Sequence, residues 1–185
     1  MHPKPSSVNS SKHIFIINGS AGEFSANKIL IDHIIHSTPN ITFNICPDLK
    51  TIPHFSPELT LDRTPAIVLQ LRDSIEKADA VLICTPEYIF SIPSGLKNLL
   101  EWCVASTVFT GKPAGFITAA AHGEKGHEEL RLIMQTLGAR LTNHTTLLLQ
   151  GIKGKIDTTN QIESITQKSI STLMNALIEL LETKS

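Results

Sequence analysis

The loop that follows the apolar run 80–84 contains side chains well suited to binding a ligand. The run itself predicts a buried strand, and the polar residues Glu87, Tyr88 and Ser91 come within a few positions of its end. Pro86 has no backbone N–H to donate, so it should end the sheet ladder and begin a loop. A carboxylate, a phenol and a hydroxyl among bulky apolar residues would suit a flat ligand with a polar rim.

A helix should follow this loop. Pro93 is favoured at the first position of a helix. Apolar residues then recur at helical spacing along one face, namely Ile92, Leu96, Leu99, Leu100 and Cys103. A strand followed directly by a loop and a helix places that loop at the carboxyl end of the strand. In open α/β sheets this edge is where ligands bind, so we expect a ligand site here.

The stretch from Thr85 to Trp102 resembles the signature PEYN-x-S-x-P, LKN and D-W of the flavodoxin-like NAD(P)H-dependent FMN reductases. The positions that match are Pro86, Glu87, Tyr88, Ser91, Pro93, Leu96, Lys97, Asn98 and Trp102. Ile89 stands where the family has Asn, and Glu101 where it usually has Asp. Taken singly, Tyr88 and Trp102 would more often be packing residues than ligand contacts. So many matches at fixed spacing make the resemblance specific.

A second loop, residues 19–27, has the character of an anion site. It leaves the expected strand 13–18 with Gly19 and Ser20, and it enters a helix for which Ser25 is the candidate N-cap. Backbone N–H groups and hydroxyls at the positive end of a helix favour a phosphate. The loop is neither a Walker loop nor a GxGxxG motif, and the alternative for a Gly-Ser turn before a helix is a simple cap.

This second loop resembles the family's GS-x-R-x-x-S-x-N turn, which implies that it binds the FMN phosphate. The positions that match are Gly19, Ser20, Ser25 and Asn27. Gly22 occupies the arginine position, so the charge-assisted contact of a guanidinium is missing, and Glu23 beside it adds a negative charge. Phosphate binding would then depend on amides, hydroxyls and the helix dipole.

A third loop, expected at 119–126, is rich in small residues that permit a close backbone approach. It resembles the loop that lines the flavin ring in the family, and the pair Leu130-Arg131 behind it also fits. The resemblance implies that non-covalent FMN contacts Gly19, Ser20, Gly22, Ser25, Ala26, Asn27, Pro86, Glu87, Tyr88, Ile89, Ser91, Ala120, Ala121, His122 and Gly123. No catalytic side chain is expected, because the flavin carries the hydride chemistry; the alternative role for Glu87 is that of a general acid.

Five strands alternate with five helices along the chain, which predicts an α/β fold with a parallel, doubly wound sheet. The strands are expected at 13–18, 41–46, 80–84, 114–118 and 141–149, and the last helix at 158–182. The pattern alone does not separate the flavodoxin-like strand order from the Rossmann order. The resemblance favours the flavodoxin-like three-layer sandwich, with the order 2-1-3-4-5 and helices on both faces.

The chain has 185 residues, and we expect one domain over 13–185 after a disordered, polar lead-in at 1–12 without secretory character. A net charge of −1 gives no reason to expect nucleic acid or an anionic membrane as a partner, and no apolar run is long enough to span a membrane. Three cysteines without CxxC spacing and eight scattered histidines favour a reduced, cytoplasmic protein without a metal site.

The proline-punctuated segment 47–64 is long for a loop in a compact domain. It contains Ile52, Phe55 and Leu59, and exposed apolar groups at this density tend to mark an interface. We therefore expect a partner subunit, rather than its own domain, to order this segment. The resemblance implies a homodimer, often paired into a tetramer, with this segment and the helix after Pro93 near the neighbouring subunit.

The function that the resemblance implies is that of an NAD(P)H-dependent FMN reductase. Hydride would pass from NADPH or NADH to bound FMN, and on to a quinone, azo, metal or flavin acceptor in a ping-pong cycle. Two alternatives stay open. One is a flavin-binding electron-transfer module, which a net charge of −1 disfavours. The other is a degenerate member with weak or no FMN binding, which Gly22, Glu23 and Ile89 favour.

Overall fold

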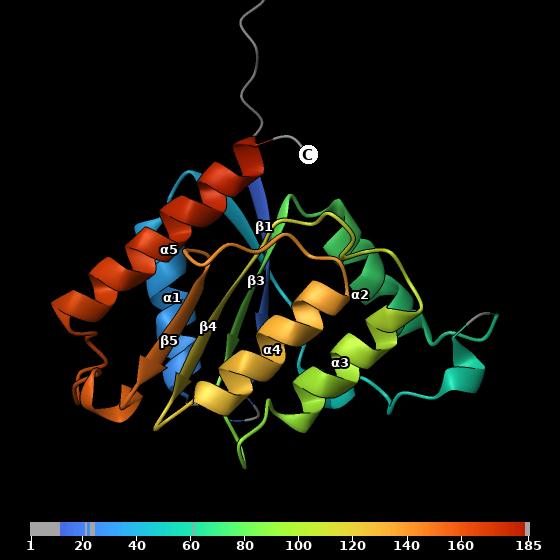
Figure 1. Cartoon of the computed structure of the whole chain (residues 1–185), viewed down its shortest axis with the longest axis horizontal. Coiled ribbons are helices and arrows are strands. Elements are labelled where there is room, and N and C mark those ends of the chain that lie inside the picture. Colours follow the sequence, from blue (N-terminus) through green and yellow to red (C-terminus); the bar gives the residue numbers. More distant parts are fainter. Residues whose placement is uncertain (1–11, 21, 23–24, 61, 184–185) are drawn as a thin grey trace, which may run out of the picture.

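The computed structural model describes residues 12–20, 22, 25–60 and 62–183. They form one five-stranded sheet with helices on both sides (Figure 1). The strands are β1 (Lys12–Asn18), β2 (Ile41–Ile45), β3 (Ala80–Thr85), β4 (Ala114–Ala120) and β5 (Thr146–Gln150). Every neighbouring pair is parallel, and the order is β2-β1-β3-β4-β5. The predicted flavodoxin-like fold and strand order are confirmed.

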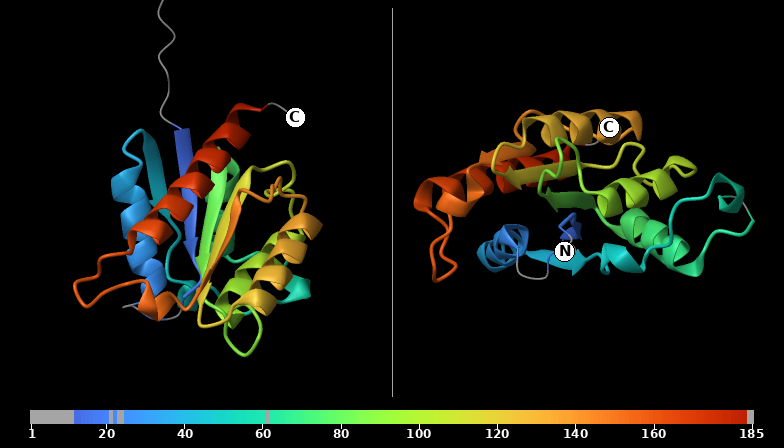
Figure 2. Two further views of the ribbon diagram at one scale, coloured as in Figure 1. Left: turned by 60° about the vertical axis from the view of Figure 1, so that its left-hand side comes forward. Right: turned by 90° about the horizontal axis from the view of Figure 1, so that it is seen from below.

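The helices divide between the two faces of the sheet (Figure 2). They are α1 (Ala26–Ser37), α2 (Ala66–Lys77), α3 (Ser94–Val104), α4 (Glu124–Thr136) and α5 (Ser164–Glu182), with short 3-10 turns η1 (Leu49–Thr51), η2 (Pro57–Leu59) and η3 (Ile152–Gly154). α1 and α5 pack on the face that carries Ile14 and Ile16, and the other three helices pack on the face that carries Phe15 and Ile17. The sheet is therefore buried on both sides, as a parallel sheet requires.

Local sequence signals place several of the element boundaries. The Ser25 side chain accepts a hydrogen bond from the Lys28 N–H and caps α1, as predicted. Gly138 lies just beyond α4 with a φ of 81°, a left-handed conformation that ends helices. β2 has an alternating pattern of exposure and lies at the edge of the sheet, also as predicted.

The predicted start of the fifth strand is wrong. β5 begins at Thr146, and residues 141–145 precede it without being part of it. The hydroxyl of Thr142 accepts from the Thr145 N–H, and the hydroxyl of Thr145 accepts from the Thr142 N–H. These side-chain bonds compete with the sheet ladder and form a turn instead.

The predicted start of the last helix is also wrong. α5 begins at Ser164, so residues 158–163 lie outside it. The Asp157 carboxylate accepts hydrogen bonds from the backbone N–H groups of Thr159 and Gln161, both at 2.8 Å. Asp157 thereby fixes a local turn at the point where the sequence pattern predicts a helix.

Of the predicted lead-in at 1–12, residues 1–11 lie outside the described part of the chain, whereas Lys12 already belongs to β1. Glu23, predicted to lie near the phosphate, also falls outside the described residues. None of the helices formed by the residues that the structure describes is long and apolar enough to cross a membrane.

Candidate functional site at the carboxyl edge of the sheet

The sheet register brings the ends of β1, β3 and β4 together at one edge. Asn18 pairs with Cys84, and Thr85 pairs with Thr118, so the loops that follow these strands begin side by side. The Gly19 N–H donates to the Cys84 carbonyl at 2.7 Å and holds the start of the first loop against β3. The three predicted loops therefore start from the same edge of the sheet.

Gly19 allows the first loop to approach β3 closely. A Cβ at this position would lie 2.6 Å from Thr85 Oγ1 and 3.0 Å from a methyl carbon of Leu96. A side chain does not fit there, which explains the glycine. At Gly22, by contrast, the described atom nearest to an added Cβ would be Ser20 Oγ, at 3.8 Å.

The first turn of α1 contains a buried polar atom without a partner. Asn27 is 2% exposed, yet its side-chain oxygen accepts no hydrogen bond from the residues that the structure describes. An unpaired buried acceptor costs about 1–3 kcal/mol. Asn27 follows Ser25 and Ala26 at the start of α1, where the first N–H groups of the helix have no intrahelical acceptor. A ligand with a hydroxyl and an anionic group would satisfy the Asn27 oxygen and these N–H groups.

Glu87 fastens the second loop to the third. Its Oε1 accepts from the Gly123 N–H at 3.1 Å, and its Oε2 accepts from the Gly126 N–H at 2.8 Å. Gly123 is the N-cap of α4 and has no side chain of its own, so the Glu87 carboxylate takes over the capping and meets the positive end of the helix. With both oxygens bound to amides, Glu87 is a positioning group.

Glu129 of α4 holds the other end of the second loop, and sequence reasoning missed it. Its Oε2 accepts from Ser91 Oγ at 2.7 Å and from the Ile92 N–H at 3.0 Å, while its Oε1 accepts from Lys97 Nζ at 3.0 Å. The pKa of Glu129 is lowered: partial burial acts to raise it, but the hydrogen bonds from Ser91, Ile92 and Lys97 and the charge of Lys97 outweigh burial. Glu129 therefore stays ionised to a lower pH than an ordinary glutamate.

Between these two anchors the chain makes a tight turn with an unusual backbone. Tyr88 and Ser91 exchange two backbone hydrogen bonds, of 2.9 and 3.1 Å, across Ile89 and Phe90. Both central residues have a positive φ, 50° and 58°, the geometry of a type I′ turn that favours Asn and Gly. Ile89 and Phe90 are 95% and 73% exposed. A β-branched residue is strained in this conformation, so the anchors must hold the turn against that strain.

The third loop is shorter than predicted. β4 extends to Ala120 and α4 begins at Glu124, so only residues 121–123 connect them. Ala120 is buried at the end of its strand, whereas Ala121 and His122 are exposed. The strand continues because its apolar side chains keep a buried place in the sheet, which a composition of small residues did not reveal. Gly123 has a φ of 95° at the helix start, a conformation that suits glycine.

α3 holds the segment that was expected to depend on a partner subunit. Asn98 accepts from the Phe55 N–H at 2.7 Å and donates to the Pro53 carbonyl at 3.0 Å. The Trp102 indole N–H donates to the same carbonyl at 2.8 Å, and the Phe55 ring packs edge-on against the fully buried Trp102 ring. Ile52 is buried in the same core. For residues 52–55 the prediction is wrong, because the protein's own α3 satisfies their backbone and apolar groups.

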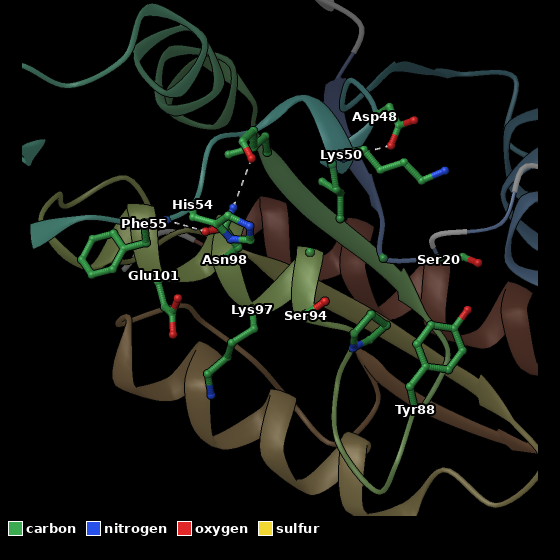
Figure 3. Close-up of a pocket in the computed structure, with 15 residues that line it drawn as sticks. Ser20, Asp48, Lys50, His54, Phe55, Tyr88, Ser94, Lys97, Asn98 and Glu101 are labelled. Atoms are coloured by element: carbon green, nitrogen blue, oxygen red, sulfur yellow. Dashed lines mark hydrogen bonds between the residues drawn. The ribbon is translucent and has the colours of Figure 1, made fainter.

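A cavity of about 720 Å³ opens between the first two loops and α3 (Figure 3). Among the predicted site residues, Gly19, Ser20 and Tyr88 line it, and η1 with the segment 52–55 forms the opposite wall. The three-residue third loop does not line this cavity but meets the second loop through Glu87. Fold and loops together define a flavodoxin-like protein with a ligand cavity at the carboxyl edge of its sheet.

Other predicted residues lie outside this cavity. Gly22 faces a neighbouring hollow of about 370 Å³, which Ser20 also lines. Ser25 and Ala26 open onto a separate hollow of about 560 Å³ beside η3. Pro86 is buried at the start of the second loop, where its carbonyl accepts from the Thr85 hydroxyl at 3.0 Å.

Several proteins with similar sequences are named as reductases. The profile of the NADPH-dependent FMN reductases matches residues 13–153. The chain is 35% identical over 141 residues to the NADH:(hydroxy)cinnamate reductase subunit CrdA of Vibrio ruber, covering 72% of this chain and 68% of that protein. It is 32% identical over 120 residues to the quinone reductase of Escherichia coli strain K12, covering 62% of this chain and 64% of that protein.

A solved structure agrees with the fold. FerB, a flavoenzyme NAD(P)H:(acceptor) oxidoreductase from Paracoccus denitrificans, superposes with a TM-score of 0.80 at 24% identity, over 92% of this chain and 97% of that one. The chain belongs to the NADPH-dependent FMN reductase family, a family of flavoprotein oxidoreductases. The matched stretches span about two thirds of the length of the two curated relatives.

Proposed function

We propose that this chain is an NAD(P)H-dependent flavoprotein reductase that binds FMN non-covalently at the carboxyl edge of its sheet. NADPH or NADH would deliver hydride, and a small oxidised acceptor would receive it. The observation that carries the proposal is the convergence of three loops at the ends of β1, β3 and β4 in a member of the FMN reductase family.

The loop between β1 and α1 is the proposed phosphate site. The N–H groups at the start of α1 and the hydroxyls of Ser20 and Ser25 are suitable donors for an anion. The unpaired side-chain oxygen of Asn27 would accept a hydrogen bond from a hydroxyl of the ribityl chain. Gly19 keeps the loop close to β3 and leaves room beyond it. These features fit FMN.

The second and third loops are the proposed seat of the flavin ring. Contacts would come from Pro86, Glu87, Tyr88, Ile89 and Ser91 on one side and from residues 120–123 on the other. The role of Glu87 is to keep these loops together, which its two amide bonds support over a role as general acid. When bound, FMN supplies the hydride-accepting and hydride-donating chemistry, while the protein binds and orients it.

The cavity of about 720 Å³ is the proposed place for both the nicotinamide and the acceptor. One shared space implies that the two occupy it in turn, which gives ping-pong kinetics. The names of the relatives support a small acceptor, because they include a quinone reductase, a 2-hydroxy-1,4-benzoquinone reductase from Burkholderia and an NADPH azoreductase from Bacillus. The acceptor class we propose is therefore quinone or azo, with metal ions and free flavin as further candidates.

A cytoplasmic homodimer with one domain per chain completes the proposal. α3 and α4 lie side by side (Figure 1), and each exposes a large apolar residue, Val104 and Leu132, both 66% exposed. Exposed apolar residues on neighbouring helices suit a symmetric subunit contact. Light scattering at micromolar concentration should give twice the mass of the chain, and a monomer would contradict the dimer.

The experiment that tests the function is a titration of the FMN-free protein with FMN, followed by anaerobic addition of NADPH or NADH. Flavin fluorescence should be quenched on binding, and the yellow colour should bleach with the nucleotide and return with a quinone. Absence of quenching at tens of micromolar FMN would overturn the reductase function and favour a degenerate family member. Quenching without bleaching by either nucleotide would favour an electron-transfer module.

A further inference from the structure

We propose that Lys50 supplies the positive charge that the phosphate loop of this chain lacks, by placing its ammonium group against the FMN phosphate. The inference rests on the proposed function. Residues 19–27 contain no lysine or arginine and include the acidic Glu23, so the loop itself offers a doubly charged anion hydroxyls and dipoles but no positive charge. A cation from elsewhere in the chain would correct this deficit.

Lys50 lies on the same hollow as Ser20 and Gly22, two residues of the phosphate loop. The hollow of about 370 Å³ is lined by Ser20 and Gly22 from the loop, by Lys28 from α1, and by Asp48 and Lys50 from η1 and the residue before it. Figure 3 shows the Lys50 side chain extending from η1 toward the side of the larger cavity on which Ser20 lies. Two elements far apart in the sequence therefore face one hollow.

The two lysines on this hollow differ in their partners. Lys28 forms an ion pair with Asp32 of the same helix, with Nζ–Oδ distances of 2.9 and 2.7 Å. Lys50 Nζ makes no hydrogen bond or ion pair with any residue in the described part of the chain. The charge of Lys28 is already compensated, whereas that of Lys50 is available to a ligand.

The backbone beneath Lys50 is fixed, although its side chain is free. Asp48 caps η1 by accepting the Lys50 N–H at 3.0 Å, and the Thr51 hydroxyl donates to the Asp48 carbonyl at 2.7 Å. Leu49 is buried, and its Cβ lies 3.4 Å from where a Cβ on Gly95 would be. The backbone of η1 is thus fixed next to the start of α3, and only the side-chain rotamer of Lys50 needs to change when a ligand binds.

Asp48 provides a second test, in which the expected change in FMN affinity has the opposite sign. Its carboxylate faces the same hollow and would repel the phosphate that Lys50 attracts. Asn at this position keeps the oxygen that caps η1 and removes the charge. If both groups face the phosphate, Lys50→Gln should weaken FMN binding and Asp48→Asn should strengthen it.

The experiment is a fluorescence titration of FMN-free protein with FMN and with riboflavin, which has the same ring and no phosphate. Loss of one charge-assisted contact should raise the Kd for FMN about tenfold in Lys50→Gln, with the Kd for riboflavin unchanged. The matched control Lys28→Gln should change either Kd less than about twofold, because that lysine is paired. Asp48→Asn should lower the Kd for FMN, and added salt should shrink both effects.

Adding an arginine to the loop gives a rescue. Lys50→Gln combined with Gly22→Arg, which places a guanidinium in the loop, should bind FMN more tightly than Lys50→Gln alone. Unchanged FMN affinity in Lys50→Gln, or equal weakening for riboflavin, would overturn the role of Lys50 while leaving the reductase function intact. Failure of the unmodified protein to bind either flavin would instead overturn the proposed function.

Discussion

The loop and the helix within residues 85–102 are positioned in opposite ways. The loop is held from outside, because Glu129 of α4 binds its end and its own Glu87 reaches across to the start of the same helix. The helix holds another segment, because Asn98 and Trp102 fix the backbone around Pro53. The signature therefore contains a loop whose position depends on other elements and a helix that fixes the position of another segment.

The chemistry of the two sets of anchors differs as well. The loop is held by carboxylates, whose hydrogen bonds are strong while they are ionised, and the pKa of Glu129 is lowered by the groups that bind it. The helix acts through a neutral amide and an indole buried in the core, and these bonds do not change with pH in the physiological range. Loss of a helix anchor should therefore lower the free energy of unfolding more than loss of a loop anchor, whereas the effect of losing Glu129 should depend on pH.

The largest effect is expected for Asn98→Ala. This change removes the acceptor of the Phe55 N–H and a donor to the Pro53 carbonyl at a buried position beside the cavity. We expect the free energy of unfolding to fall by about 3 kcal/mol. Urea denaturation measures it, and Asn44→Ala on the exposed edge strand is the control, with less than about 0.5 kcal/mol expected. If both variants lose the same small amount of unfolding free energy, α3 does not hold the segment 52–55.

A smaller, pH-dependent effect is expected for Glu129→Gln. The variant weakens the bonds to Ser91 and Ile92 and loses the partner of Lys97. The free energy of unfolding should therefore be about 1–2 kcal/mol lower at neutral pH. The pKa of Glu129 in the folded protein lies below its ordinary value of 4.5. The stabilisation is therefore present above pH 4.5 and is lost as the pH falls through the folded pKa. Denaturation at a series of pH values should show the two proteins converge in acid; a constant gap would argue against the carboxylate as anchor.

The smallest effect, and one of opposite sign, is expected for Ile89→Asn. Asn tolerates a positive φ better than a β-branched residue, so the variant should be more stable by about 1 kcal/mol. Ile165→Asn is the matched control, since Ile165 is also exposed but lies in α5 with helical dihedrals. A gain in both variants would reflect removal of an exposed apolar group, and no gain at Ile89 would mean that the turn is not strained.

The fold could be predicted because its signals are local. The capping serine before α1, the glycine after α4 and the buried runs in the strands each specify their own neighbourhood. The errors arose where side chains compete with the backbone, as at Thr142 and Asp157, whose bonds form turns in place of a strand and a helix.

The site could be predicted only as far as its loops. Their place at the ends of β1, β3 and β4 follows from topology, but their supports are contacts between distant residues. Glu129 lies 38 residues from Ser91, and Asn98 lies 43 residues from Phe55. The matched family signature contains Asn98 without revealing its partner, and nothing local distinguishes Glu129 from the acidic residues beside it in α4.

The double anchoring of the turn at residues 88–91 also bears on the entropy of binding. Ordering the backbone of one residue costs about 1–2 kcal/mol, and a loop that orders only around its ligand subtracts that cost from the affinity. Here Glu87 and Glu129 order the loop when the chain folds. The entropy lost in ordering the loop then lowers the stability of the fold, and it does not lower the affinity for a ligand that binds at the edge of the sheet.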